Sequence, residues 1–163
     1  MSEKPLVAVL MGSRSDYETV EPGIKVLKEF DIPVEVKILS AHRTPDQTKE
    51  FILSAEKNGV KVFICAAGMA AHLAGVVASH TTRPVIGIPI ASGALNGVDS
   101  LYSTVMMPPG IPVATVAING AQNAAYLALE ILQDGVEGLK ARLWESRKKM
   151  AIKVIEANDE LGK

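Results

Sequence analysis

The residue types best suited to chemistry gather in one short segment, residues 40–46, which reads SAHRTPD. Ser40 offers a hydroxyl, His42 an imidazole and Arg43 a guanidinium. Thr44 is a typical N-cap residue and Pro45 is typical of the first helical position, so we expect a helix to begin here. Free amides at a helix N-terminus favour anions, and the segment could therefore hold a phosphate. A capped strand-to-helix turn with a solvated histidine and arginine would give the same pattern.

His42 is also the side chain best able to move a proton at neutral pH. The chain has three histidines and a single cysteine, Cys65, which lies in an apolar run and is interpreted as a buried thiol. His72 is expected within the first turns of a helix, where it could equally serve as a structural hydrogen-bonding group. His80 lies near an expected helix end and is interpreted as a surface or capping residue.

A second polar segment, residues 13–16 with the sequence SRSD, follows the first apolar run of the chain. Its hydroxyls and guanidinium suit a phosphate, and its carboxylate suits a sugar diol. The pattern Ser15-x-x-Glu18 indicates a capping box, as does Thr44-x-x-Gln47 in the segment 40–46. A helix cap without a ligand is the alternative interpretation of residues 13–16.

The composition indicates a single folded domain over 1–163, in which 48% of residues are hydrophobic and 21% are charged. The net charge of 17 − 18 = −1 gives no electrostatic reason to expect a nucleic-acid or membrane partner. Residues 1–5 do not resemble a signal peptide, and no apolar run is long enough to span a membrane. We therefore expect a cytoplasmic protein. No group of Cys, His and carboxylate residues has metal-ligand spacing, so no metal site is predicted.

Apolar runs that alternate with helical patterns predict an α/β fold, with a doubly wound, flavodoxin-like sheet of five parallel strands and flanking helices. A long helix is expected over about 136–160, and a shorter one over 98–105. In such sheets the ligand lies at the carboxyl ends of the strands, so the loops that follow the first four strands are the candidate site. The strands are predicted at Leu6–Met11, Val34–Leu39, Val62–Cys65, Val85–Ile90 and Val113–Ile118.

The loop expected after the third strand, residues 66–71, consists almost entirely of alanine and glycine. Small residues would let a flat ligand lie against backbone amides, although tight packing of a helix on a strand requires the same residues. The dinucleotide-binding, phosphate-binding P-loop and nucleophile-elbow motifs do not occur in the chain.

Four motifs occur in the order and spacing of the PurE family: Met11–Asp16, Ser40–Pro45, Ala70–Leu73 and Asp99–Ser103. The chain resembles this family, N5-carboxyaminoimidazole ribonucleotide mutase of purine biosynthesis, over nearly its whole length. Arg43 resembles class I, the mutases. Class II, which carboxylates aminoimidazole ribonucleotide with free CO2, typically has lysine there.

The resemblance implies that His42 is the catalytic proton carrier and that CO2, released from the substrate, stays trapped until it bonds to carbon 4. It also implies a homo-octamer that acts on a small-molecule substrate and needs no cofactor. By the same resemblance, the substrate-binding residues are Ser13, Ser15, Asp16, Ser40, Arg43, Ala67, Gly68, His72 and Leu73.

Two residues depart from the pattern of that family. Met69 stands where the family commonly has glycine, and could narrow the pocket for the base or point away from it. Met106 replaces a glutamine. Two other interpretations stay open at this point: a nucleotide-binding flavodoxin-like domain without catalysis, and a flavin-binding electron carrier. The stripe of Leu139, Leu143, Met150 and Val154 predicts that the last helix packs on a neighbouring subunit.

Overall fold

The structure is a computed structural model that describes residues 4–161 of the 163 in the chain. These residues form two compact units, which meet in the sequence between Ala128 and Leu129. The single domain expected over 1–163 stays a prediction, and its ends, residues 1–3 and 162–163, lie outside the described part, as does the start of the segment 1–5. Between residues 4 and 161, no helix combines the length and the apolar character that crossing a bilayer requires.

The first unit is built on a parallel five-stranded sheet, which confirms the predicted fold class. The strand order is β2-β1-β3-β4-β5, so β1 lies between β2 and β3. The loops that follow these three strands therefore leave the same edge of the sheet side by side. The strands are β1 (Val7–Met11), β2 (Val34–Ile38), β3 (Val62–Gly68), β4 (Val85–Ile90) and β5 (Ala114–Thr115).

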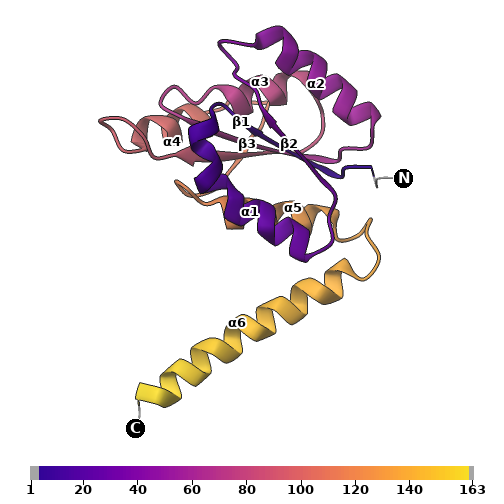
Figure 1. Ribbon diagram of the computed structural model, residues 1–163, viewed down its shortest axis with the longest axis vertical. Helices are drawn as coiled ribbons and strands as arrows, with labels where there is room; N and C mark the ends of the chain where they lie inside the picture. The colour runs from indigo at the N-terminus through magenta and orange to yellow at the C-terminus, as the bar shows by residue number, and fades with distance from the viewer. Residues whose placement is uncertain (1–3, 162–163) are drawn as a thin grey trace. The chain divides into compact units, whose positions relative to one another are not determined.

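Helices cover both faces of this sheet (Figure 1). One face carries α2 (Pro45–Lys57), α3 (Leu73–His80) and α4 (Val98–Val105). The other face carries α1 (Tyr17–Glu29) and the part of α5 (Ala121–Leu132) that belongs to the first unit. A single turn of 3-10 helix, η1 (Arg14–Asp16), precedes α1.

The central strands are buried on both faces, as the nearly continuous apolar runs predict. All five residues of β1 and the first five of β3 are buried. Phe63 and Cys65 of β3 pack in one cluster with Ile52 of α2 and Val77 of α3. Burial of a large apolar side chain contributes about 1.5–3 kcal/mol, so this cluster holds α2 and α3 against the sheet. Cys65 is buried, which confirms the prediction, and its burial raises the pKa of the thiol.

Gly87 in β4 allows α4 to approach the sheet closely. A Cβ atom at this position would lie 2.3 Å from Cγ2 of Thr104 and 3.5 Å from Cβ of Ala74. The first distance is well inside van der Waals contact, so a larger residue would push α4 outward. The bounds of β4 and α4 agree with those predicted from the sequence.

The fifth strand is much shorter than the predicted Val113–Ile118, because β5 pairs with β4 over only two residues. The carbonyl oxygens of Gly87 and Pro89 accept hydrogen bonds from Val116 and Asn119, so both residues face β5. Pro89 has no N–H group to return to β5, and the regular ladder ends before it. The prediction for this strand was therefore wrong in length.

The second unit contains the end of α5, a short turn and α6 (Leu139–Leu161). α6 begins at Leu139 rather than at the predicted residue 136, after Gly138 with a left-handed φ of 71°. Leu139 and Leu143 are buried, and Arg147 forms an ion pair with Glu130. The guanidinium of Arg147 also lies over the Trp144 ring, 5.6 Å from its centroid.

Candidate functional site

A cavity of about 480 Å³ lies at the carboxyl ends of β1, β2 and β3. All ten residues predicted as catalytic or substrate-binding line it, although their roles are still predictions. Five further residues line the same cavity: Gly12, Ala41, Met69, Ala70 and Ser92. Arg14, which the sequence offered as a second phosphate ligand, does not line the cavity, because its guanidinium packs over the Tyr17 ring at 4.5 Å.

The loop after β1 is closed by a capping box, but not by the predicted one. Ser13 is the N-cap, and its hydroxyl accepts a hydrogen bond from the amide of Ser15 at 3.3 Å. The Asp16 carboxylate accepts one from the amide of Ser13 at 3.1 Å. The box is thus Ser13-x-x-Asp16, and the predicted Ser15-x-x-Glu18 box was wrong. Ser13 has the extended backbone of an N-cap residue, and the chain is already helical by Ser15.

Asp16 is a buried carboxyl group at the edge of the cavity. Burial raises its pKa above the usual value, although hydrogen bonds from the Ser13 amide and the Ser15 hydroxyl act in the opposite direction. Its Oδ2 holds the loop backbone, and Oδ1 lies 3.5 Å from the Ser15 hydroxyl. A partly desolvated carboxylate that accepts these bonds is well placed to accept further ones from a ligand diol.

The loop after β2 is held by Thr44 in a way that the sequence did not predict. The Thr44 hydroxyl donates to the carbonyl oxygen of Ser40 at 3.0 Å, and its oxygen accepts from the Ser40 amide at 2.9 Å. Thr44 is the N-cap of α2 and Pro45 is its first residue, as predicted. Its side chain makes no cap hydrogen bond, so the Thr44-x-x-Gln47 box was wrong.

Arg43 connects the loops after β1 and β2. Its Nη2 donates to the carbonyl oxygen of Gly12 at 3.0 Å, and its Nε lies 3.4 Å from the hydroxyl of Ser40. The Arg43 amide also donates to this hydroxyl, at 3.2 Å. A guanidinium carries five N–H donors, so these two side-chain contacts leave others for an anion in the cavity.

His42 and His72 meet across the cavity, although they lie 30 residues apart in the sequence. Nε2 of His42 is 2.9 Å from Nδ1 of His72, and the rings are nearly perpendicular, with centroids 5.0 Å apart. In such a contact one nitrogen carries the proton and the other accepts it, so each ring restricts the tautomer and orientation of the other. His72 immediately precedes α3 and is its N-cap.

The end of β3 forms another side of the cavity, and this strand runs three residues into the predicted loop, to Gly68. A Cβ atom at Gly68 would lie 2.4 Å from the Ser92 hydroxyl, so a larger residue there would displace the Ser92 side chain. Ser92 follows β4, and its buried hydroxyl has no protein partner within the described residues. Sequence reasoning did not identify Ser92, although the loop after the fourth strand was a candidate by position.

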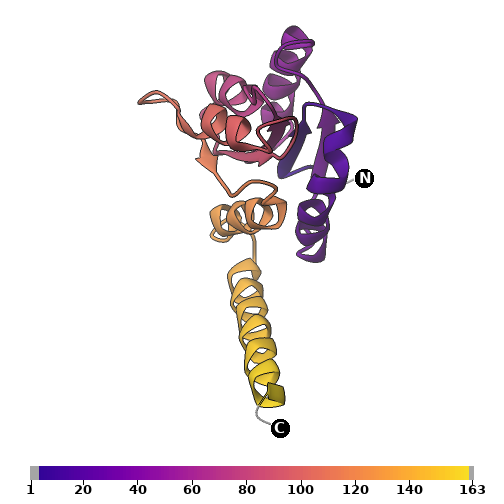
Figure 2. The ribbon, with the colours of Figure 1, turned by 90° about the vertical axis from the view of Figure 1, so that its left-hand side faces the viewer.

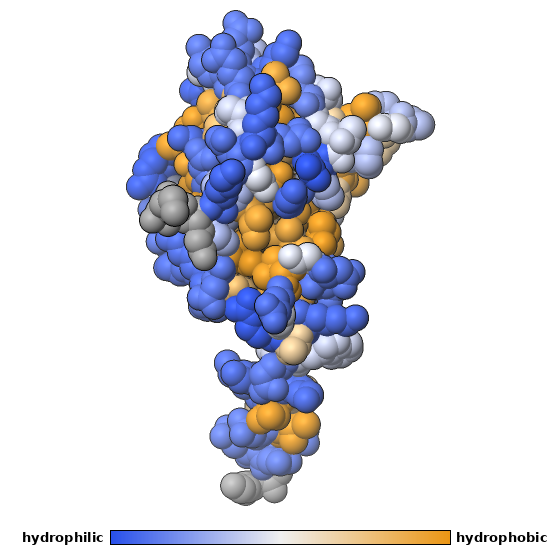
Figure 3. Space-filling model, turned by 90° about the vertical axis from the view of Figure 1, so that its right-hand side faces the viewer, coloured by the Kyte–Doolittle hydropathy of each residue, from blue (hydrophilic) through white to orange (hydrophobic). Residues whose placement is uncertain are grey.

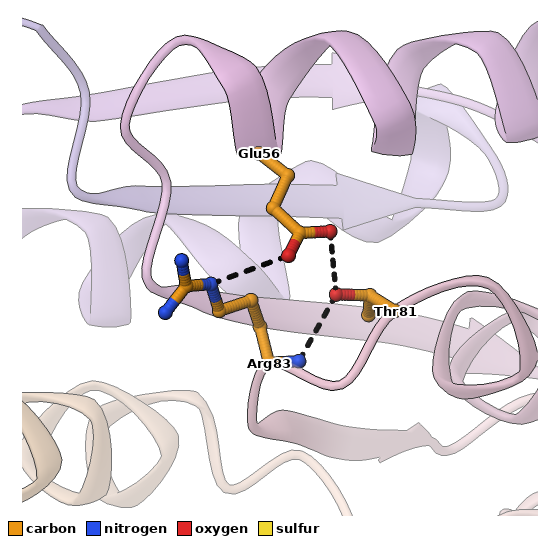
Figure 4. A network of polar contacts seen from close by, with 3 residues as sticks. All are labelled: Glu56, Thr81 and Arg83. Carbon is orange, nitrogen blue, oxygen red and sulfur yellow. Dashed lines mark hydrogen bonds and ion pairs between the residues drawn. The ribbon is translucent and has the colours of Figure 1, made fainter.

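A larger cavity of about 800 Å³ lies at the opposite end of the strands, where β4 and β5 begin. Its charged groups interact with one another (Figure 4). Glu56 of α2 accepts a hydrogen bond from the hydroxyl of Thr81 at 3.0 Å and lies 3.4 Å from Nε of Arg83. These contacts join α2 to the start of β4 and pair the carboxylate of the cavity with its arginine. The cavity also lies away from the carboxyl ends of the strands, where ligands bind in such sheets. The cavity beside His42 is therefore the better candidate site.

Three comparisons with known proteins agree on what this chain is similar to. The model of the AIR carboxylase family matches residues 6–153. The N5-carboxyaminoimidazole ribonucleotide mutase of Pyrococcus horikoshii is 53% identical over 155 residues, which cover 95% of this chain and 88% of that protein. The mutase of Bacillus subtilis is 49% identical over 160 residues, or 97% and 99% of the two chains. The crystal structure of Treponema denticola PurE is 32% identical, with a TM-score of 0.88 and coverage of 98% and 99%.

Proposed function

The chain belongs to the AIR carboxylase family, and we propose that it is an N5-carboxyaminoimidazole ribonucleotide mutase that acts in purine biosynthesis in the cytoplasm. The reaction moves a carboxyl group from the exocyclic nitrogen of the substrate to carbon 4 of its imidazole ring. The observation that carries the proposal is the contact of the His42 and His72 rings in a cavity that is also lined by Ser13, Ser15 and Ser40.

His42 serves as the proton carrier in this proposal. The bond between nitrogen and the carboxyl carbon breaks, CO2 leaves, and His42 donates a proton to the nitrogen. Carbon 4 then forms a bond to CO2, and His42 takes back a proton from that carbon. The protons balance, and no oxidant or reductant is needed. A positioned imidazole of this kind contributes about 10²- to 10⁴-fold to the rate.

The loops after β1 and β2 hold the nucleotide. Arg43 and the hydroxyls of Ser13, Ser15 and Ser40 provide donors for the phosphate, and each charge-assisted hydrogen bond contributes about 1.5–3 kcal/mol. The Asp16 carboxylate accepts from the ribose diol. Ala67, Gly68 and Leu73 line the space for the base, and the small residues Ala67 and Gly68 let a flat ring approach the backbone.

The test is turnover by the purified full-length protein in both directions, with and without bicarbonate. We expect conversion of the N5-carboxylated ribonucleotide without added bicarbonate. Conversion of aminoimidazole ribonucleotide only when bicarbonate is supplied would assign class II instead. Absence of both reactions, with nucleotide binding retained, would favour a non-catalytic binding domain.

We also propose that copies of this chain associate, as an octamer by its resemblance to the family. Beyond Leu143, α6 exposes Trp144, Met150 and Val154, and apolar side chains show on its C-terminal half in Figure 3. The connection from α4 to β5 projects from the sheet in Figure 2 and carries the exposed Met106. Burial of apolar surface contributes about 25 cal/mol per Å², so docking of these exposed side chains on another copy would be favourable.

A further inference from the structure

Met69 has a backbone conformation that side chains with a Cβ atom rarely adopt. Its φ is +55°, in the left-handed region where glycine is favoured. The residue follows the end of β3, and the turn after it is held by Ser103 of α4. The Ser103 hydroxyl accepts from the amide of Ala71 at 3.0 Å and lies 3.3 Å from the carbonyl oxygen of Met69. Strained residues persist where the surroundings fix them in this way, and they concentrate at functional sites.

This backbone places a large apolar side chain at the rim of the cavity. Met69 lines the cavity and is nevertheless 61% exposed. Among the fifteen described residues that line it, the only other large apolar side chain is Leu73, which is buried. Gly93, in the loop after β4, also has a positive φ, and a Cβ atom there would lie 4.0 Å from Cγ of Met69. The Met69 side chain therefore extends toward the loop after β4.

We propose that Met69 is a cover residue, whose thioether side chain lies over the base and slows the escape of CO2 before carbon 4 captures it. The inference rests on the proposed function. Between release and capture, CO2 has two fates: a bond to carbon 4 gives the product, and escape leaves aminoimidazole ribonucleotide and free CO2. An unbranched, adaptable side chain suits a cover that must exclude water and yet let the nucleotide enter.

The experiment measures how the enzyme divides its substrate between these two fates. Substrate with a 13C-labelled carboxyl group is converted in unlabelled bicarbonate, and the decarboxylated nucleotide and retained label are measured against an enzyme-free control. Met69→Ala removes the thioether but keeps the Cβ atom and its strain. Met69→Leu keeps an apolar side chain of similar volume. The matched control is Leu95→Ala, because Leu95 is 60% exposed on the loop after β4 but does not line the cavity.

We expect Met69→Ala to raise the ratio of decarboxylated to rearranged nucleotide about tenfold, which corresponds to about 1.4 kcal/mol. Met69→Leu and Leu95→Ala should leave this ratio within about twofold of wild type, a change well below 1 kcal/mol. An unchanged ratio in Met69→Ala, with normal wild-type turnover, would overturn the inference alone. No conversion by the wild-type protein would overturn the proposed function and this inference with it.

A second variant separates the side chain from the backbone strain. Met69→Gly removes both, and relief of the backbone strain should raise Tm by about 2–4 °C for a chain of this size. Its ratio of the two nucleotides should match that of Met69→Ala. A smaller oligomer for Met69→Ala in sedimentation, with an unchanged ratio, would identify Met69 as a contact between copies and would overturn the cover.

Discussion

Replacing His42 with asparagine should stop the reaction without displacing the nucleotide. His42 is exposed on the loop after β2, and its Nε2 lies 2.9 Å from Nδ1 of His72. The substitution touches no core residue, so the free energy of unfolding should change by about 0.5 kcal/mol or less. Asparagine keeps a polar group in the cavity but cannot exchange a proton near neutral pH.

The expected loss follows from comparing two contributions of the imidazole. Loss of the hydrogen bond to His72 alone would remove about 0.5–1.5 kcal/mol. Loss of general acid–base catalysis removes about 10²- to 10⁴-fold in rate, or about 2.7–5.5 kcal/mol of transition-state stabilisation. The second effect dominates, so kcat should fall by at least about 100-fold while the product Kd, measured by calorimetry, stays close to that of wild type.

Substitutions of His72 test whether it orients His42. Because the contact uses Nδ1 of His72, the side-chain amide of His72→Asn can occupy nearly the same place, whereas His72→Ala removes it. His72→Ala should lose roughly 2- to 10-fold in kcat, the value of one hydrogen bond, and His72→Asn should recover most of it.

Retention of more than about a tenth of the wild-type rate in His42→Asn would refute the assignment of His42 as proton carrier.

Three further predictions address the nucleotide loops and α6. Arg43→Ala should weaken binding of a phosphorylated ligand by about 1.5–3 kcal/mol in calorimetry, and equal losses for its dephosphorylated analogue would exclude a phosphate contact. Folding raises the pKa of Asp16, so the folded state takes up this proton at a higher pH than the unfolded state. The contribution of Asp16 to the free energy of unfolding therefore rises as pH falls from the raised pKa to the usual 3.8. Denaturant unfolding of Asp16→Asn should lack this pH-dependent contribution. The nucleotide affinity of Asp16→Asn should also be lower than that of wild type. Deletion from Met150 onward should give a smaller or less stable assembly in sedimentation, and an unchanged assembly would contradict docking through α6.

Local sequence patterns predicted the bounds of those elements that begin and end because of residues next to them in the chain. β4 is bounded by Arg83-Pro84 on one side and Ala91-Ser92-Gly93 on the other, and its predicted bounds were confirmed. The fifth strand was predicted too long because its limit depends on Pro89, which lies in a different strand more than twenty residues earlier. A strand ends where its partner stops pairing, and single-strand periodicity carries no information about that partner.

The residues predicted for the site line one cavity, and their roles stay predictions, but the contacts among them were not predicted. The sequence contains two overlapping capping patterns, Ser13-x-x-Asp16 and Ser15-x-x-Glu18, and only the backbone conformation at Ser13 decides between them. The contact between His42 and His72 depends on the strand order, which sets the loops after β2 and β3 on either side of β1. The available signal was that each histidine follows the carboxyl end of a predicted strand, His42 by three residues and His72 by seven.

Both edges of the sheet are poor templates for adding another strand. β2 is short, follows Pro33 and carries Lys37 on its exposed part, and β5 pairs over only two residues after Pro112. Charged residues, prolines and very short edge strands are the features that prevent edge-to-edge aggregation. Pairing of two chains through backbone hydrogen bonds at these edge strands is therefore disfavoured. In the oligomer proposed above, copies would therefore contact each other through side chains on helices and loops rather than through backbone pairing of strands.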